Sequence, residues 1–240
     1  MGRFLPLFLL LMLGACVGVA PHVEGVRTLG IVSAIGDKFY LRKVGFTVFG
    51  NESQDFAADS WGIDELMTSK LHAALADRFE VRPVTYRRAA FVNLENRLAI
   101  GVDRLRAETV RAEVSPQGLD AYLVVTKGIG QFGQTNQILL GLGLVEGPTI
   151  FKADNIYVHA YYALSMVDGH AWTLSSPTYS SLPGGQGLFG PRPKAVMRQV
   201  DQSWWPASLD AASNERLKAA VVELIDQSLP NTLQRMQLVQ

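Results

Sequence analysis

The stretch Gly118-Leu119-Asp120-Ala121-Tyr122-Leu123-Val124-Val125 decides the fold, because it introduces an apolar strand in the middle of the 240-residue chain. Residues 121–126 are apolar apart from the final Thr126. A continuous apolar run of this length, entered through a glycine turn, is typical of a buried strand. We therefore expect residues 121–126 to form the central strand of a β-sheet.

Further strands are predicted on the N-terminal side of this stretch. Residues 28–35 and 39–49 are predicted to form a hairpin around the turn Gly36-Asp37. Residues 79–86 are predicted as a short strand. Because Pro83 cannot donate a backbone hydrogen bond, we expect this strand at an edge or a bulge.

The C-terminal half also contains strand signals. Residues 156–167 predict the longest strand of the chain. Asp168-Gly169 is a two-residue hairpin signal, from which the chain is expected to return through residues 170–175. Residues 128–147 are rich in glycine and are expected to form a glycine-rich strand or loop.

A polar loop over residues 50–59 is expected to lead into an amphipathic helix over residues 60–77. Asp59 or Ser60 can cap this helix, and acidic residues follow in its first turn. The helix is predicted from an apolar stripe with helical spacing, formed by Ile63, Leu66, Met67, Leu71, Ala74 and Leu75.

Two more helical regions are predicted. Residues 87–114 are weakly helical, in two pieces that are broken near Gly101. Ser213 is expected to cap the last helix, and Pro230 is expected to kink or end it. The stripe of this last helix consists of Leu217, Ala220, Val221, Leu224, Ile225 and Leu229.

These elements predict an α/β (α+β) fold over residues 28–240. We expect a single domain with a mixed β-sheet of about five to six strands and helices packed on it. Residues 176–208 form a Gly/Pro-rich insertion that we expect to be a long surface loop.

Charge and cysteine content exclude several classes of protein. The chain has 22 basic and 22 acidic side chains, and 18% of its residues are charged. This balance argues against a highly charged disordered chain and gives no global nucleic-acid footprint. Cys16 is the only cysteine, which excludes an internal disulfide framework and a zinc site built from several thiolates.

The first fifteen residues predict a signal peptide. Arg3 supplies a positive charge, residues 4–13 form an apolar run, and Leu13-Gly14-Ala15 precedes Cys16. This pattern resembles the lipobox of bacterial lipoproteins, in which cleavage leaves the cysteine as the first residue and lipid is attached to its sulfur. The alternatives are a plain signal anchor over residues 4–20 and a buried core cysteine.

The lipobox resemblance implies an anchored, exported protein. Residues 16–27 would be the lipidated tether, with palmitate among the acyl chains on Cys16. Val17 follows the cysteine, where an aspartate would signal retention at the inner membrane in such lipoproteins. The resemblance therefore implies an outer-membrane anchor facing the periplasm.

Five segments stand in a recognisable order along the chain: Phe49-Gly50-Asn51, Gly62-Ile63-Asp64-Glu65-Leu66, Phe79-Glu80-Val81, residues 118–125 and Val167-Asp168-Gly169-His170. This order resembles the periplasmic lipoprotein superfamily that includes the curli-secretion lipoprotein and the activator lipoprotein of penicillin-binding proteins. This resemblance covers residues 43–175 and implies an anticodon-binding-like α/β fold. The strand over residues 28–35 and the insertion over 176–208 have no counterpart in it.

No motif predicts a cofactor or a metal. Residues 128–133 fit GxGxxG, but the residues that follow make a poor helix, which a dinucleotide site needs. His159 and His170 would lie roughly 26 Å apart along the predicted strand. The acidic residues between 52 and 65 could bind calcium, but helix-start acids explain most of them.

Two surfaces are candidate contact sites. A basic region between residues 70 and 111 could meet an anionic surface, although a solvated helical face is the alternative; its candidate contacts are Arg82, Arg87, Arg88, Arg104, Arg106 and Arg111. Apolar side chains of the insertion could form a partner surface or plug the core. These are Tyr179, Leu182, Leu188, Phe189, Trp204 and Trp205.

The sequence predicts a non-enzymatic accessory or binding protein of the cell envelope. Its partners would be the membrane, through Cys16, and an envelope protein or a second copy, without nucleic acid. The alternative is an oligomeric secretion component, which would need hairpins of about ten residues per strand. A third hypothesis is a cell-wall-active enzyme, for which no carboxylate pair stands out.

Overall fold

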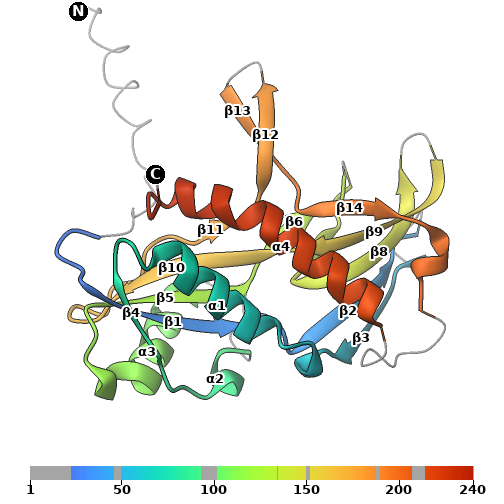
Figure 1. The fold of residues 1–240 in the computed structure, drawn as a ribbon. Helices are drawn as coiled ribbons and strands as arrows, with labels where there is room; N and C mark the ends of the chain where they lie inside the picture. The colour runs from blue at the N-terminus through green and yellow to red at the C-terminus, as the bar shows by residue number, and fades with distance from the viewer. Residues whose placement is uncertain are drawn as a thin grey trace, which may run out of the picture.

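The structure is a computed structural model that describes residues 23–45, 50–92, 102–133, 135–149, 152–187, 190–206 and 214–239 (Figure 1). The described residues form one mixed α/β domain with two five-stranded sheets, two two-stranded sheets and four α-helices. The predicted class is confirmed. The strands are divided between two large sheets, where the sequence predicted one sheet of about five to six strands.

The first sheet contains the strand that the sequence placed at its centre. Its order is β11-β10-β5-β1-β4, with β1, β4 and β5 parallel and β10 antiparallel to β5. Every residue of β5 is buried, which confirms the interpretation of the apolar run. The bounds are β1 Thr28–Ala34, β4 Glu80–Arg82, β5 Ala121–Lys127, β10 Tyr162–Asp168 and β11 Thr178–Tyr179.

The second sheet has the order β14-β9-β8-β2-β3. Because β1 and β2 belong to different sheets, the predicted hairpin around Gly36-Asp37 is wrong. The turn carries the chain from one sheet to the other. The bounds are β2 Lys38–Lys43, β3 Glu52–Ala57, β8 Leu142–Thr149, β9 Lys152–Ala160 and β14 Met197–Val200.

Strand β3 lies where a polar loop was predicted. Only Phe56 of its six residues is buried, so the segment shows no apolar alternation. Phe56 stacks on Phe39 of β2, with ring centroids 5.2 Å apart. Pairing with β2 therefore makes this segment a strand.

The predicted strand over residues 156–167 is two strands. Strand β9 ends at Ala160 and β10 begins at Tyr162, so the chain changes sheets at Tyr161. The amide of Tyr161 donates to Gly141 and its carbonyl accepts from Gly128. The hydrophobic pattern of an apolar run does not show whether its residues form one strand or two strands in different sheets.

The predicted two-residue hairpin at Asp168-Gly169 is also wrong. The turn is wider, because Val167 bridges to Leu174 and Trp172 adopts a φ of 56°. A Cβ at residue 169 would lie 2.0 Å from the carbonyl oxygen of Leu119. A glycine is therefore needed at position 169 because the backbone at Leu119 lies too close for a side chain, and not because of a tight turn.

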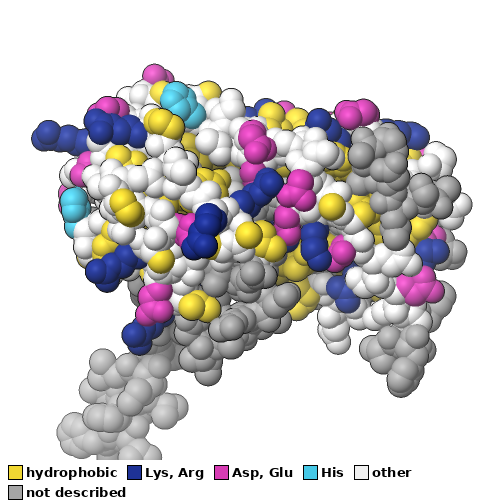
Figure 2. All heavy atoms as spheres, turned by 90° about the horizontal axis from the view of Figure 1, so that it is seen from below, with side chains coloured by type: hydrophobic (Ala, Val, Ile, Leu, Met, Phe, Trp, Pro, Cys, Tyr) yellow, Lys and Arg dark blue, Asp and Glu magenta, His cyan; other side chains and the backbone are white. Residues whose placement is uncertain are grey.

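Helices cover both faces of the first sheet (Figure 1). Helices α1 (Ile63–Leu75) and α4 (Glu215–Arg235) lie on one face, and α2 (Arg88–Val92) and α3 (Val102–Val114) lie on the other. These four helices confirm the predicted helical regions. Figure 2 views the molecule from the side of α2 and α3, where basic and acidic side chains are interspersed.

The helix ends differ from the expected caps. Gly62 is the N-cap of α1 and makes no side-chain bond, so neither Asp59 nor Ser60 caps it. Asn214 caps α4 by accepting from the amide of Leu217, while Ser213 lies outside the described residues. Helix α4 continues through Pro230. Short 3₁₀ turns occur at Asp59–Trp61, Ser115–Gln117 and Gln202–Trp204.

The residues of β1 alternate between two hydrophobic cores. Leu29 and Ile31 face the main core, which contains the buried side chains of α1 and α4. Val32 and Ala34 face a second core under α2 and α3. The second core consists of Val32, Ala34, Phe91, Val110, Val114, Leu119, Tyr122, Val124 and Val167.

The insertion over residues 176–208 is not the loop that was predicted. It contains β11, a hairpin of β12 (Leu182–Gly187) and β13 (Gly190–Lys194) that projects from the body, and β14 (Figure 1). Strand β14 is an edge of the second sheet and pairs with β9. The glycine-rich residues 128–147 contribute a smaller hairpin, β6 (Ile129–Gln131) with β7 (Ile138–Leu140), and β8.

Candidate functional site

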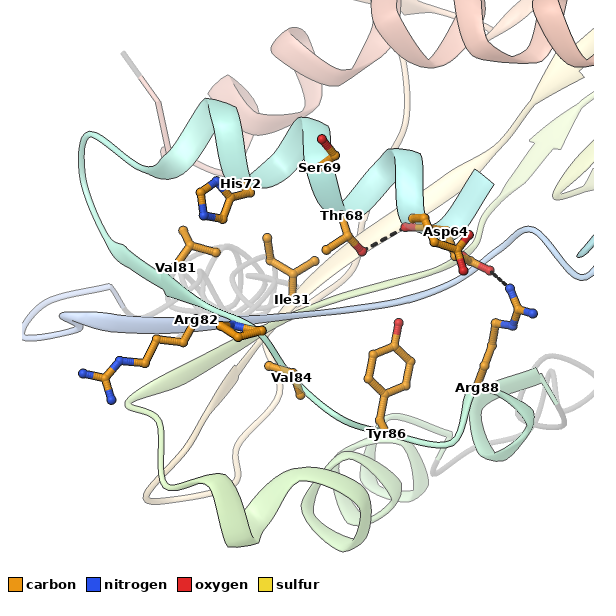
Figure 3. Close-up of a pocket in the computed structure, with 12 residues that line it drawn as sticks. Ile31, Asp64, Thr68, Ser69, His72, Val81, Arg82, Val84, Tyr86 and Arg88 are labelled. Carbon is orange, nitrogen blue, oxygen red and sulfur yellow. Dashed lines mark hydrogen bonds and ion pairs between the residues drawn. The ribbon is translucent and has the colours of Figure 1, made fainter. Parts of the chain in front are cut away.

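A cleft of about 740 Å³ lies between α1 and the segment that follows β4 (Figure 3). Its apolar lining consists of Ile31, Val81, Pro83 and Val84. Its polar lining consists of Asp64, Glu65, Thr68, Ser69, His72, Arg82, Tyr86 and Arg88. This combination of an apolar floor with a few polar groups is typical of ligand-binding sites of this volume.

The topology of the first sheet explains the position of the cleft. Strands β1 and β4 are parallel neighbours. After β1 the chain passes through β2 and β3 of the second sheet and then forms α1 on one face, and after β4 it forms α2 and α3 on the opposite face. Open α/β sheets bind ligands at such a reversal, near the carboxyl ends of the strands. The cleft is therefore our candidate functional site.

Beside the cleft, the side chain of Tyr86 makes the hydrogen bonds to β1 that a neighbouring strand would otherwise make. Strand β4 pairs only with Thr28, Leu29 and Gly30, and Pro83 then ends it. Beyond that point the hydroxyl of Tyr86 accepts from the amide of Ser33 and donates to its carbonyl, both at 2.9 Å. Burial raises the pKa of Tyr86, which keeps the hydroxyl protonated and able to donate.

The carboxylate of Asp64 accepts hydrogen bonds from residues at the carboxyl end of β1 and just after it. Asp64 is 4% exposed, although it belongs to the first turn of α1. One carboxylate oxygen accepts from the Ser33 hydroxyl at 2.7 Å and from the Ile35 amide at 2.8 Å. The other accepts from the Gly36 amide at 3.2 Å and from Arg88 at 3.0 Å.

This role of Asp64 was not predicted from the sequence, which indicated only an acid in a helix start, a position that the structure confirms. The available signal was spacing, because Asp64, Met67 and Leu71 occupy one helical stripe and are all buried. A carboxylate on an apolar stripe must find hydrogen-bond donors inside the fold.

Arg88 joins the cleft to α2. Its guanidinium donates to Asp64 and, at 2.8 Å, to Asp59. Burial alone lowers the pKa of Arg88, but hydrogen bonding to Asp64 and the nearby carboxylates outweigh it and leave the pKa raised. The two bonds use two of the five N–H groups of the guanidinium.

The remaining polar side chains lie along the rim. In Figure 3, Thr68 and Ile31 point into the cleft, whereas the guanidinium of Arg82 points away from it. Arg82 pairs with Glu80 at 2.8 Å. Glu65 is exposed and forms no ion pair with any residue that the structure describes.

Two of the six predicted anionic-contact arginines, Arg82 and Arg88, line this cleft. Arg87 pairs with Glu113, Arg104 pairs with Glu108, and Arg111 lies 6.0 Å from the ring of Trp172. Arg106 is half-buried on α3. The arginines are thus distributed among carboxylates and an aromatic ring, in keeping with the interspersed charges in Figure 2.

The predicted partner residues have different environments. Tyr179 is 40% exposed and, with Ile138, lines a second hollow of about 530 Å³. Leu182, Trp204 and Trp205 are half-buried against the main core. Arg216 lies 4.1 Å from the Trp204 ring, and Lys43 lies 5.2 Å from the Trp205 ring. Leu188, Phe189 and Cys16 lie outside the described residues.

The histidines do not come together. His159 is buried in the second sheet, where its Nδ1 lies 3.0 Å from the carbonyl oxygen of Gly141. Burial lowers the pKa of His159 to about 4. His170 lies in the turn after β10 and is 3.4 Å from Asp120. Within the described ranges, no three histidine, cysteine or acidic side chains form a group that could hold a metal ion.

The GxGxxG segment continues as a strand instead of a helix. Gly130 belongs to β6 and lies against Tyr161, since a Cβ there would be 2.1 Å from the ring. This close packing against Tyr161 explains why residue 130 is a glycine, without a bound nucleotide phosphate. Among the helices that the structure describes, none combines the length and apolar content needed to cross a membrane.

Comparisons with known proteins give only distant similarity. No protein-family model and no curated protein sequence matches the chain. The chain is similar in structure to the hypothetical protein CT253 from Chlamydia trachomatis, with 5% identity, a TM-score of 0.34, and coverage of 89% of this chain and 96% of that one.

Two further solved structures show a comparable level of similarity. Lipoprotein GNA1162 from Neisseria meningitidis has 14% identity and a TM-score of 0.27, over 84% of this chain and 98% of that one. Protein XCC0632 from Xanthomonas campestris, of the family DUF330, has 11% identity and a TM-score of 0.30, over 91% and 88%. At such TM-scores the superpositions are loose, and no function follows from them.

Proposed function

We propose that this chain is an exported bacterial lipoprotein that acts as a non-enzymatic accessory or binding protein of the cell envelope. The observation that carries the proposal is Leu13-Gly14-Ala15-Cys16 at the end of a short apolar run, with the only cysteine of the chain at the cleavage position. Acylation with palmitate and other chains would anchor Cys16 stably, since several acyl chains bind a bilayer far better than one.

The start of the domain supports a short anchor. Val23 and Val26 pack against the main core, and the amide of Arg27 donates to Asp120 at 3.0 Å. Six residues lie between Cys16 and Val23, and the seven steps along the chain place the anchor point at most about 25 Å from the domain. A lipid on Cys16 would restrict the domain to a layer at the membrane surface, which raises its effective concentration for a partner there.

The site geometry favours binding over catalysis. Two polar groups of the cleft are already engaged. The buried Asp64 accepts from the Ser33 hydroxyl and the Ile35 amide, and the half-buried Tyr86 bonds to the amide and the carbonyl of Ser33. A carboxylate with four donors is poorly suited to proton transfer, because its lone pairs are occupied. The outer-membrane location rests on Val17, since an aspartate after the cysteine would favour the inner membrane.

Metabolic labelling tests this function directly. The wild-type chain, Cys16→Ser and Val17→Asp are expressed in a Gram-negative host with an alkyne analogue of palmitate, and the membranes are separated by density. We expect labelled wild-type protein in the outer membrane, no label and no membrane association for Cys16→Ser, and a shift of Val17→Asp to the inner membrane. Full membrane association of Cys16→Ser would contradict the proposal.

The same material separates the alternative functions. Light crosslinking of the membranes is expected to give a discrete product with another protein. A ladder of self-crosslinked species would favour the oligomeric secretion component. Hydrolysis of purified peptidoglycan that disappears with a single Asp or Glu substitution would favour a cell-wall-active enzyme.

A further inference from the structure

We propose that the cleft between α1 and the segment after β4 binds an extended protein segment that combines an apolar side chain with a lysine or arginine. This inference deepens the proposed function, because it identifies the docking site and the chemistry of the partner. It rests on the shape of the cleft, its apolar floor and an excess of carboxylates around it.

The floor of the cleft is suited to an apolar side chain. Val81 is only partly buried, and with Ile31 of β1 it forms part of the floor (Figure 3). Pro83 continues this apolar wall. A side chain placed there would remove apolar surface from water on both sides of the contact, at roughly 25 cal/mol per Å².

The charges around the cleft favour a cationic partner. Both arginines of the lining are already paired, Arg82 with Glu80 and Arg88 with Asp59 and Asp64. The lining and its ion-pair partners thus place two guanidinium groups among four carboxylates, which are Asp59, Asp64, Glu65 and Glu80. Charge complementarity at a rim of this kind steers association and excludes partners of like charge.

Glu65 is the group that we expect to contact the cation. It is exposed on the cleft side of α1, and within the described part of the chain it has no ion pair. Asp64 cannot take this role, because Ser33, Ile35 and Gly36 already donate to it in addition to Arg88.

The length of the cleft suits an extended segment. The α1 wall runs from Asp64 to His72, which corresponds to about 12 Å of helix. About four residues of extended chain span that distance. On this wall the Thr68 hydroxyl donates to the carbonyl of Asp64 at 2.9 Å and can still accept a hydrogen bond from a peptide amide (Figure 3).

Fluorescence anisotropy with defined peptides tests this inference on the full mature chain in a non-ionic detergent. The probe is an octapeptide of alternating leucine and lysine; the comparison peptides alternate leucine with glutamate and serine with lysine, and empty micelles are the blank. We expect the leucine–lysine peptide to bind at least tenfold more tightly than either comparison peptide.

Three variants locate the binding. Glu65→Lys removes the exposed carboxylate and is expected to weaken binding at least fivefold, and Thr68→Trp fills the cleft and is expected to abolish it. Glu24→Lys makes the same charge change at an exposed residue outside the cleft and is expected to stay within twofold of wild type. Thermal melting confirms that each variant is folded.

The outcomes separate this inference from the proposed function. Wild-type binding by both cleft variants, or equal loss in Glu24→Lys, would overturn it. Peptide binding does not require the lipid, so Cys16→Ser is expected to bind as wild type does. Binding without acylation of the wild type would contradict the envelope function alone, and acylation without peptide binding would contradict the cleft inference alone.

Discussion

Strand β1 is held at its two ends by two aspartates in different environments. At the amino end, Asp120 accepts from the amides of Arg27 and Thr28 and from the Thr28 hydroxyl, and its side chain is 31% exposed. At the carboxyl end, Asp64 is 4% exposed and also accepts from Arg88. Both aspartates therefore accept hydrogen bonds from donors at an end of β1. Asp120 stabilises the fold only, whereas Asp64 also lines the candidate site.

Burial makes the difference between the two ends. Water can replace the lost partners of a carboxylate that is partly exposed, but it cannot reach the partners of one that is buried. We therefore expect the free energy of unfolding to depend far more on Asp64 than on Asp120.

Asp64→Ala is expected to have the largest effect, with a loss of about 3–5 kcal/mol in the free energy of unfolding. It leaves the buried Ser33 hydroxyl and the buried amides of Ile35 and Gly36 without an acceptor, and it removes the ion pair with Arg88. Urea unfolding measures this loss. The matched control is Asp59→Ala, which removes the exposed partner of Arg88 and is expected to cost less than about 1 kcal/mol. Equal losses in the two variants would contradict the comparison.

Tyr86→Phe is expected to cost about 1–3 kcal/mol, since it leaves both the amide and the carbonyl of Ser33 without their partner. Chemical denaturation and the exchange rate of the Ser33 amide check this. Exchange should accelerate at Ser33 and not at Thr28, which lies at the other end of the strand. An unchanged Ser33 amide would show that β1 does not depend on the phenol.

Asp120→Asn is expected to cost about 1–2 kcal/mol at pH 7, after allowance for its partial exposure. Hydrogen bonds from Thr28 and Arg27 lower the pKa of Asp120 from 3.8 to about 2. A lowered folded-state pKa gives stability that is present above pH 3.8 and is lost as the pH falls through about 2. The difference between wild type and variant should therefore shrink below pH 4 in urea titrations at successive pH values.

His159 also makes the stability of the fold depend on pH, in a range above that of Asp120. Burial lowers the pKa of His159 from 6.5 to about 4, so the neutral ring stabilises the fold above pH 6.5 and this contribution is lost as the pH falls towards 4. The loss amounts to about 3 kcal/mol by pH 4. His159→Gln should remove the pH dependence between 6.5 and 4 and leave the lower range unchanged.

His170→Ala is expected to have the smallest effect at the amino end of β1. His170 is 77% exposed and lies 3.4 Å from Asp120, so its removal should change the free energy of unfolding by less than about 0.5 kcal/mol. Thermal melting at pH 6 and pH 8 measures it. A larger loss would mean that the exposed end of β1 depends on this contact more than its geometry indicates.

The cleft could be predicted only in part from the sequence. The helix that forms one wall and the edge strand that forms the other were both expected, as was the position of Asp64 in a helix start. That Asp64 turns back onto β1, and that Tyr86 lies beside Ser33, could not be expected, because these contacts join residues 31 and 53 positions apart. No local pattern encodes such a pairing.

What the sequence determined by itself is local: the buried strand β5, the amphipathic helices α1 and α4, the helical character of residues 88–92 and 102–114, and the edge position of β4 before Pro83. Hydrophobic periodicity and backbone restrictions act over neighbouring residues, so they can be read along the chain. Only the tertiary structure decided which strands share a sheet, where the run over residues 156–167 divides, and that the polar segment of β3 becomes a strand. Those outcomes depend on pairing between distant segments, whose hydrogen bonds and buried surface exist only after the chain has folded.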